Sequence, residues 1–344
     1  MTNLVTDYMG LSLRNPLVAS ASPISRTVDG VRRLADAGVG AVVLHSLFEE
    51  ELAEESERNA RIADAGTESF AESLSYLPGN AGEDPGPRRY LSLVERATAA
   101  VEIPVIASLN GVTPGGWSGY AQAIQSAGAV AIELNIYYLP GSADISGRRV
   151  ERRHLEILEQ VKSVVTIPVA VKLSPYFSST AEMVKQLDDA GADAVVLFNR
   201  FMQPDIDPES LQASSGPGLS ISAESLLPRT WIALLSKRIS ASLAASTGVE
   251  TAEDVVKYLL AGSDVVMSTS SLLRHGPGYA EILLDGLSDW MARKGFSSLS
   301  EVRGRFAVPA GVDASYQERS GYVATLRNAN ASAYGLWPSE PVRP

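Results

Sequence analysis

The sequence of 344 residues contains no cysteine. Disulfide bonds, thiolate metal sites and iron–sulfur ligation by this chain are therefore excluded. No apolar run approaches the roughly 20 residues that a membrane helix needs, and the composition, with 45% apolar and 20% charged residues, is that of a soluble globular protein. The first residues, MTNLVTDYMGLSLRNP, lack the basic start and apolar core of a signal peptide, which predicts a cytoplasmic protein.

Basic residues are outnumbered by acidic ones, 29 to 40, which gives a net charge of −11. An acidic surface repels nucleic-acid phosphates and anionic lipid, and the sequence holds no run of basic residues that would compensate. We therefore expect a small-molecule substrate, and neither a nucleic acid nor a membrane as partner.

Four segments share one phrase, in which a helix-like pattern ends at Ala-Gly and leads into a short apolar run. They are ADAGVGAVVLHS (35–46), QSAGAVAIELN (125–135), DDAGADAVVLFNR (188–200) and LLAGSDVVMSTS (259–270). Glycine supplies the left-handed backbone that ends many helices, and the runs after it are too apolar for strands with one wet face. The phrase predicts helix-to-strand junctions that feed a buried parallel sheet.

Four more segments complete a set of eight predicted strands. They are residues 15–22, 102–111, 166–175 and 241–248. Amphipathic segments alternate with the strands, at residues 28–38, 89–101, 115–127, 151–165, 180–190, 228–238, 251–261 and 278–294. This alternation predicts an α/β fold, a (β/α)8 TIM barrel. A doubly wound sheet is the alternative, but ASASPIS after the first strand does not supply its G-x-G-x-x-G turn.

The chain divides into one predicted barrel, residues 1–305, and a C-terminal helical extension and tail, residues 306–344. Before the first strand, TDYMGLSLRNP predicts an N-terminal hairpin that turns at Met9-Gly10 and closes the barrel bottom. Long connections follow three strands, at residues 48–88, 139–150 and 201–227. They therefore belong to the C-terminal face, where barrels build active sites, and the first is a predicted lid.

Side chains at the C-terminal ends of the strands are expected to point into the site. They include Ser20, His45, Ser46, Ser108, Asn135, Tyr137, Tyr138, Lys172, Asn199, Arg200, Thr247, Gly248, Thr269 and Ser270. Carboxylates are nearly absent from this set. This argues against hydrolysis by paired carboxylates and against a metal site.

Small hydroxyl residues and glycine end the last two strands, in STGVETAED and MSTSS. This pattern at strands seven and eight favours a phosphate site over a mere turn. Lys172, inside VAVKLSP, is charged in an otherwise apolar strand, so it should meet an anion or an electron-rich ligand atom. The alternatives are a solvent-facing lysine and a Schiff-base nucleophile.

Several motifs together resemble the dihydroorotate dehydrogenase family over residues 3 to 305. They are NPLVASAS, ELN, VAVKLSP, FNR, STGVETAEDVVKYLLAGSDVV and SLLRHGP, while NIYYLP, VLFNRFMQPDID and LLRHGP are similar to a divergent branch. The resemblance implies FMN across the barrel mouth. By motif position the phosphate would lie near Thr247, Gly248, Thr269 and Ser270, and Lys172 near the flavin pyrimidine edge. The remaining cofactor contacts would come from Ala19, Ser20, Ser46, Ser108 and Asn135.

The sequence departs from the family pattern where the substrate base is expected. Tyr137 to Pro140 occupy the place of the usual Cys or Ser, and His45 matches a lysine that closes the second strand. Tyr138 is the first candidate for the missing proton donor, followed by Tyr137 and His45, although aromatic residues over a flavin often only stack. Asn135, Asn199 and Arg200 are the candidate substrate residues. Arg200 would clamp an anion or pair with Asp205 or Asp207.

The preferred hypothesis is an FMN-dependent oxidoreductase of pyrimidine metabolism, acting on a CH–CH or C=C bond next to a carbonyl. Dihydroorotate, orotate or another pyrimidine-like compound would be the substrate. The alternatives are an ene-reductase type of flavoprotein, one that depends on a separate electron-transfer partner, and a non-redox phosphate-binding lyase that uses Lys172. A homodimer is left open.

Overall fold

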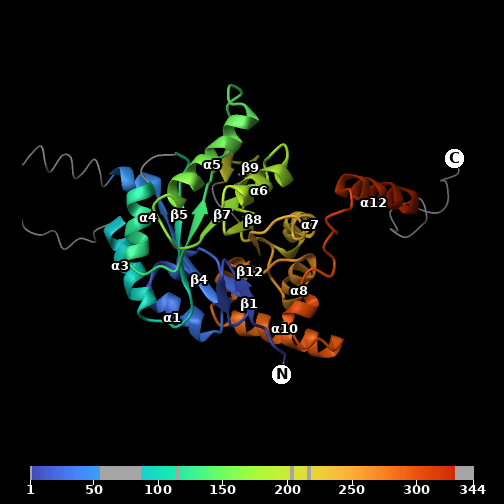
Figure 1. Ribbon diagram of the computed structural model, residues 1–344, viewed down its shortest axis with the longest axis horizontal. Helices are drawn as coiled ribbons and strands as arrows, with labels where there is room; N and C mark the ends of the chain where they lie inside the picture. The colour runs from blue at the N-terminus through green and yellow to red at the C-terminus, as the bar shows by residue number, and fades with distance from the viewer. Residues whose placement is uncertain (1, 55–86, 114–116, 202–204, 215–217, 330–344) are drawn as a thin grey trace, which may run out of the picture.

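The computed structural model describes residues 2–54, 87–113, 117–201, 205–214 and 218–329. Within these ranges, eight parallel strands close into a barrel, as Figure 1 shows. Around the barrel the order is β11 (Ser242–Ala245), β12 (Val265–Ser268), β3 (Leu17–Ala19), β4 (Ala41–Phe48), β5 (Val105–Asn110), β6 (Ala131–Asn135), β7 (Val169–Leu173) and β8 (Ala194–Leu197). The predicted TIM barrel is confirmed.

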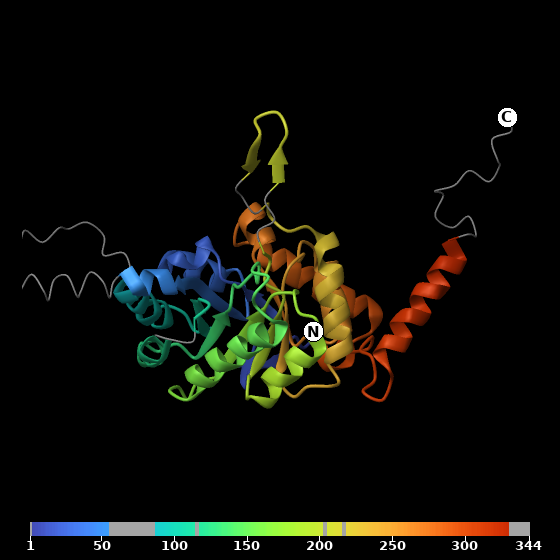
Figure 2. The same cartoon turned by 90° about the horizontal axis from the view of Figure 1, so that it is seen from above.

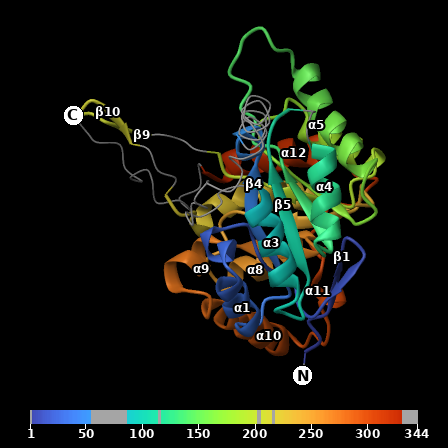
Figure 3. The ribbon, with the colours of Figure 1, turned by 90° about the vertical axis from the view of Figure 1, so that its left-hand side faces the viewer.

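Helices cover the outside of the barrel, each in the connection after a strand. They are α1 (Val28–Asp36), α3 (Pro87–Thr98), α4 (Trp117–Ser126), α5 (Gly147–Lys162), α6 (Thr180–Asp189), α7 (Leu226–Leu235), α8 (Ala252–Ala261) and α10 (Tyr279–Lys294). Figure 3 shows α1 and α3 beside β4 and β5. The glycine of each repeated Ala-Gly phrase has a positive φ, at Gly38, Gly128, Gly191 and Gly262, so each helix ends as the repeat predicts.

Strand alternation separates the core into two layers. Odd and even residues of each strand face opposite sides, so one set packs inside the barrel and the other packs under the helices. On β7, for example, Ala170 belongs to the inner cluster, whereas Val169 and Val171 belong to the outer one. The same alternation, continued to the strand ends, decides which polar side chains reach the barrel mouth.

The predicted N-terminal hairpin seals the barrel bottom. It consists of β1 (Thr6–Tyr8) and β2 (Leu11–Leu13), which pair antiparallel with Tyr8 opposite Leu11. The turn residues Met9 and Gly10 both have positive φ, as a type I′ turn requires. The Met9 amide donates to Ser242 Oγ at 3.1 Å, and the side chain of Tyr8 packs into the inner cluster.

A substitution at Tyr8 tests how the β1–β2 hairpin, the plug of the barrel bottom, packs. Its hydroxyl is buried and has no hydrogen-bond partner among the described residues, and burial, followed by the charge of Glu133, raises the pKa of the phenol. An unpaired buried hydroxyl destabilises the fold. We therefore expect Tyr8→Phe to raise the free energy of unfolding by about 1 kcal/mol, measured by urea denaturation. A loss of stability of that size would contradict the packing described for the plug.

Shorter elements complete the described chain. They are η1 (Pro23–Arg26), β9 (Asp205–Asp207), β10 (Gln212–Ser214), η3 (Ser222–Ser225), α9 (Ser270–His275), α11 (Leu299–Val302) and α12 (Ala314–Ala329). Figure 2 shows the β9–β10 hairpin and α12 projecting from the barrel. Most of the predicted lid, residues 48–88, lies outside the described residues. Among the described helices, none has the length and apolar character needed to cross a membrane.

Candidate functional site

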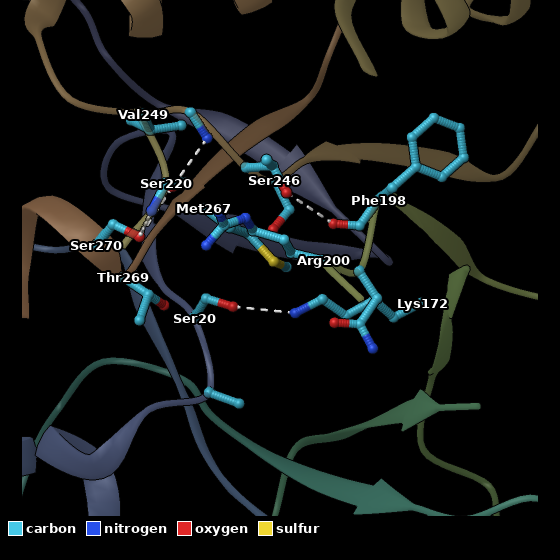
Figure 4. A pocket seen from close by; sticks show the side chains of 14 residues that line it. Ser20, Lys172, Phe198, Arg200, Ser220, Ser246, Val249, Met267, Thr269 and Ser270 are labelled. Atoms are coloured by element: carbon cyan, nitrogen blue, oxygen red, sulfur yellow. Dashed lines mark hydrogen bonds between the residues drawn. The ribbon is translucent and has the colours of Figure 1, made fainter. Parts of the chain in front are cut away.

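A pocket of about 170 Å³ opens at the C-terminal ends of the barrel strands. Its walls, shown in Figure 4, are Ser20, Ala21, Lys172, Phe198, Asn199, Arg200, Ser220, Ser246, Thr247, Gly248, Val249, Met267, Thr269 and Ser270. The sequence predicted most of the polar members because they end strands. It missed Ser220, which lies in the long connection before η3 and carries no motif.

Lys172 lies in this pocket because its strand places it on the inner side. Its neighbours Val171 and Leu173 pack in the outer cluster. The Lys172 Nζ donates to Ser20 Oγ at 3.2 Å, as Figure 4 shows, and lies 3.6 Å from Glu133 Oε1. The lysine is therefore paired, and the reading of a solvent-facing lysine is wrong.

Glu133 is the buried counter-charge that the sequence analysis missed. It is fully buried on β6, and neither carboxylate oxygen accepts a hydrogen bond among the described residues. Removing a carboxylate from water is costly, so its ion pair with Lys172 is the interaction that offsets its burial. The signal was present in the sequence, since ELN places a charge two residues before Asn135 on the same side of the strand.

The β11–β12 end of the pocket gathers small hydroxyl groups around a glycine-containing loop. Gly248 has φ 71°, and a Cβ on it would lie 2.6 Å from the Ser225 amide nitrogen, so only glycine fits there. The Gly248 amide donates to Ser220 Oγ at 3.2 Å, and that hydroxyl also contacts Ser270 Oγ at 2.8 Å. Thr269 Oγ1 is buried and lacks a partner among the described residues. Hydroxyls and backbone amides gathered at such a site suit a phosphate group.

Asn135 and Asn199 meet at the barrel mouth, since Asn199 Nδ2 donates to Asn135 Oδ1 at 2.6 Å. Arg200, the next residue, lines the pocket, but its guanidinium binds Glu224, with Nε 2.7 Å from Oε1. The expected pairing of Arg200 with Asp205 or Asp207 is therefore wrong. The amide pair and the arginine lie together, as the sequence predicted.

Ser46 faces the barrel interior, where its Oγ lies 2.8 Å from Ser108 Oγ. The β4–β5 register shifts between Val43 and Ser46, which marks a bulge. Because of this extra residue, Val43 and Ser46 both face inward and His45 turns outward to a second cavity beside Arg26. His45 is not brought to the Lys172 pocket, and it leaves the set of proposed catalytic residues.

Tyr137 and Tyr138 lie beyond the end of β6 and make different contacts. Tyr138 packs against the outer core, and the Arg153 guanidinium carbon of α5 lies 4.1 Å from its ring centroid. Tyr137 stacks on Phe201, with 4.2 Å between ring centroids, and Phe201 follows the pocket residue Arg200 in the sequence. Neither tyrosine belongs to the walls of the mouth pocket.

Ala19 contributes differently from the other expected cofactor residues. Its methyl group packs in the outer cluster. Only its backbone faces the mouth region, next to Ser20, whose amide donates to the Ser268 carbonyl at 3.0 Å. Any contact of Ala19 with a ligand would therefore be made by main-chain atoms.

Comparison with known proteins agrees with this geometry. A sequence model of the dihydroorotate dehydrogenase family matches residues 3–291. The chain belongs to this family. It is similar to the catalytic subunits of dihydroorotate dehydrogenase B (NAD(+)) from Pyrococcus abyssi, Halalkalibacterium halodurans and Methanothermobacter thermautotrophicus. The identities are 25% over 311 residues, 26% over 314 and 26% over 311, covering 88% of this chain in each case and 98%, 98% and 97% of the relatives.

Membership in the dihydroorotate dehydrogenase family makes the chain an oxidoreductase that acts on CH–CH donors, and members of the family are flavoproteins. At 25–26% identity to these relatives, the chain is a divergent member.

Proposed function

We propose that this chain is an FMN-dependent oxidoreductase that oxidises or reduces a C–C bond beside a carbonyl in a pyrimidine-like ring, with dihydroorotate and orotate as the first substrates to test. The observation that carries the proposal is Lys172. Its ammonium group opens into a pocket whose other end suits a phosphate. The names of the similar proteins support the same substrate class.

The pocket fits FMN by the chemistry of its donors. Thr247, Gly248, Thr269 and Ser270 would hold the phosphate, and the orphaned Thr269 hydroxyl offers it a hydrogen bond. Ser20 and Lys172 would contact the ring system farther along the pocket. When bound, FMN supplies the acceptance and donation of hydride that no side chain of this protein can perform.

The residues of the chain supply placement and charge. Glu133 and Ser20 hold the Lys172 side chain, so its positive charge is fixed in the pocket before any ligand arrives. Asn135 and Asn199 present amide donors and acceptors, which match the alternating carbonyl and N–H groups of a pyrimidine ring. Arg200, held by Glu224, adds a positive charge at the mouth for an anionic substrate.

Tyr137 is the proposed proton donor, because it stacks on Phe201 next to the pocket residue Arg200, whereas Tyr138 packs against the outer core. We expect Tyr137→Phe to lower turnover by about 100-fold, within the usual contribution of a general acid, with little change in flavin content. Tyr138→Phe is the matched control. It removes the same hydroxyl group from a ring that packs against the outer core, so turnover should stay within about twofold of the parent. Single-turnover rates across pH measure both. Equal rates for the two variants would remove Tyr137 from the mechanism.

Electrons are proposed to leave or enter through a separate partner. The chain has no cysteine to bind an iron–sulfur cluster. The similar proteins are named as catalytic subunits of an NAD(+)-linked enzyme, which supports a second subunit. The isolated chain is therefore expected to exchange electrons with a substrate readily and with NAD(+) slowly.

An anaerobic screen tests the proposed function. The flavin-loaded protein is mixed with dihydroorotate, and the photoreduced protein is mixed with orotate, while the flavin absorption is followed. We expect bleaching in the first case or recovery of colour in the second. If neither compound nor any related dihydropyrimidine changes the spectrum, although dithionite bleaches it, the proposed substrate class is wrong.

A further inference from the structure

A second cavity, of about 430 Å³, lies on the outer side of β4. Its walls include the end of η1, the start of α1 and one face of α3. Figure 3 shows α1 and α3 beside β4. Within the described residues the two cavities share no lining residue. The larger cavity is therefore not an extension of the mouth pocket.

Positive charge is concentrated around this cavity. Among the residues that the structure describes, Arg26, Arg89 and Arg96 line it together with one carboxylate, that of Glu51, in a chain whose net charge is −11. Arg89 and Arg96 lie seven residues apart on α3, so they project from the same face of the helix. A concave surface lined by one sign of charge concentrates counter-ions. Arginine is the side chain best suited to bind carboxylate or phosphate with two hydrogen bonds.

Aromatic and apolar side chains form one part of the cavity wall, called the floor here: His45, Tyr90, Leu47 and Leu93. Because of the bulge in β4, the His45 side chain lies on this floor. Its imidazole contacts the Tyr90 ring edge to face, with ring centroids 5.2 Å apart. Burial, followed by the positive charge of Arg26, lowers the pKa of His45 to about 4. His45 is therefore neutral at neutral pH. Leu47 and Leu93 extend the apolar floor beside it.

We propose that this cavity binds a small amphipathic anion, with an apolar body on the floor and a carboxylate or phosphate at the arginine rim. The volume lies in the range of about 300–1,000 Å³ that small-molecule sites occupy. The inference does not depend on the proposed function, because no residue of the mouth pocket takes part in it. The sequence did not reveal the site, since Arg26 and the two α3 arginines come together only in the folded chain.

The test uses 1-naphthoate and 1-naphthyl phosphate as probes, titrated calorimetrically into the full-length protein with and without added FMN. The two probes distinguish a carboxylate ligand from a phosphate ligand, and 1-naphthalenemethanol is the uncharged reference. Arg26→Gln and Arg96→Gln each remove one positive charge from the rim. Arg88→Gln is the matched control, because Arg88 precedes Arg89 on α3 and is not part of the cavity wall. Tyr90 is left intact, since its hydroxyl bonds the Ser108 backbone.

We expect one equivalent of at least one anionic probe to bind to the parent and to the Arg88→Gln variant, and to bind more weakly as salt rises. Each rim variant should weaken that binding by tenfold or more, with an unchanged circular dichroism spectrum and flavin content. Absence of saturable binding by both anions would overturn the proposal. So would equal affinity in the parent and both rim variants, or equal affinity for the uncharged reference.

Discussion

Gly248→Ala is expected to weaken FMN binding by at least 100-fold. The backbone at Gly248 has φ 71°, and the new Cβ would lie 2.6 Å from the Ser225 amide nitrogen and 3.0 Å from the Ile221 carbonyl oxygen. Both obstacles are main chain, so neither can swing aside. The left-handed backbone and the overpacking together should lower the free energy of unfolding by about 2–4 kcal/mol. Displacement of this loop would also remove amide donors from the phosphate site.

Gly276→Ala is the control that separates the loss of stability caused by the backbone from the loss of the proposed phosphate site. Gly276 also has a positive φ, 88°, but nothing lies within 4 Å of a Cβ built on it. This variant should lose about 1–3 kcal/mol, because its backbone, with φ 88° and ψ 164°, lies in a region that glycine alone adopts readily, and it should keep its affinity for FMN. Quenching of FMN fluorescence measures affinity, and urea denaturation measures stability. If the two variants bind FMN equally well, the loop at Gly248 does not hold the phosphate.

Lys172→Met should lower the rate of flavin reduction by substrate by about 100- to 1,000-fold, the usual loss when a pre-placed electrostatic group is removed. It should also destabilise the fold. Glu133 is fully buried and would lose its only ion-pair partner among the described residues. An uncompensated buried charge of this kind costs about 3–5 kcal/mol. Stopped-flow absorption and urea denaturation measure the two effects separately.

The double variant Lys172→Met, Glu133→Gln tests whether these two effects have different causes. Replacing the Glu133 carboxylate by a neutral amide removes the unpaired buried charge, so most of the lost free energy of unfolding should be recovered. The rate of flavin reduction should stay low, because the positive charge is still absent from the pocket. Recovery of the rate in the double variant would show that Lys172 acts only through the stability of the barrel.

The fold could be predicted because its signals are local and repeated. Each Ala-Gly phrase ends a helix with a positive-φ glycine, and each following run is apolar on both faces, as a parallel barrel strand must be. Lys172 and the Gly248 loop could be predicted for a similar reason. A charge in an apolar strand and a glycine at a strand end are visible without knowledge of any distant partner.

The parts of the site that could not be predicted depend on register and on distant partners. One extra residue in β4 turned His45 outward and Ser46 inward, and no sequence pattern announces such a bulge. Glu224, the partner of Arg200, lies beyond the β9–β10 hairpin, whereas Asp205 and Asp207 are closer in sequence. Tyr138 is the first candidate by motif position, whereas the contacts in the folded chain, Tyr138 against the outer core and Tyr137 against Phe201, favour Tyr137 as the proposal.

The central claim is that the barrel mouth holds FMN, with its phosphate at the β11–β12 end of the pocket. The most direct measurement is the absorption spectrum and flavin content of the purified full-length protein, before and after incubation with FMN. We expect a yellow protein with one FMN per chain, and loss of that flavin in Gly248→Ala but not in Gly276→Ala. A colourless protein that leaves the fluorescence of added FMN unchanged would contradict it.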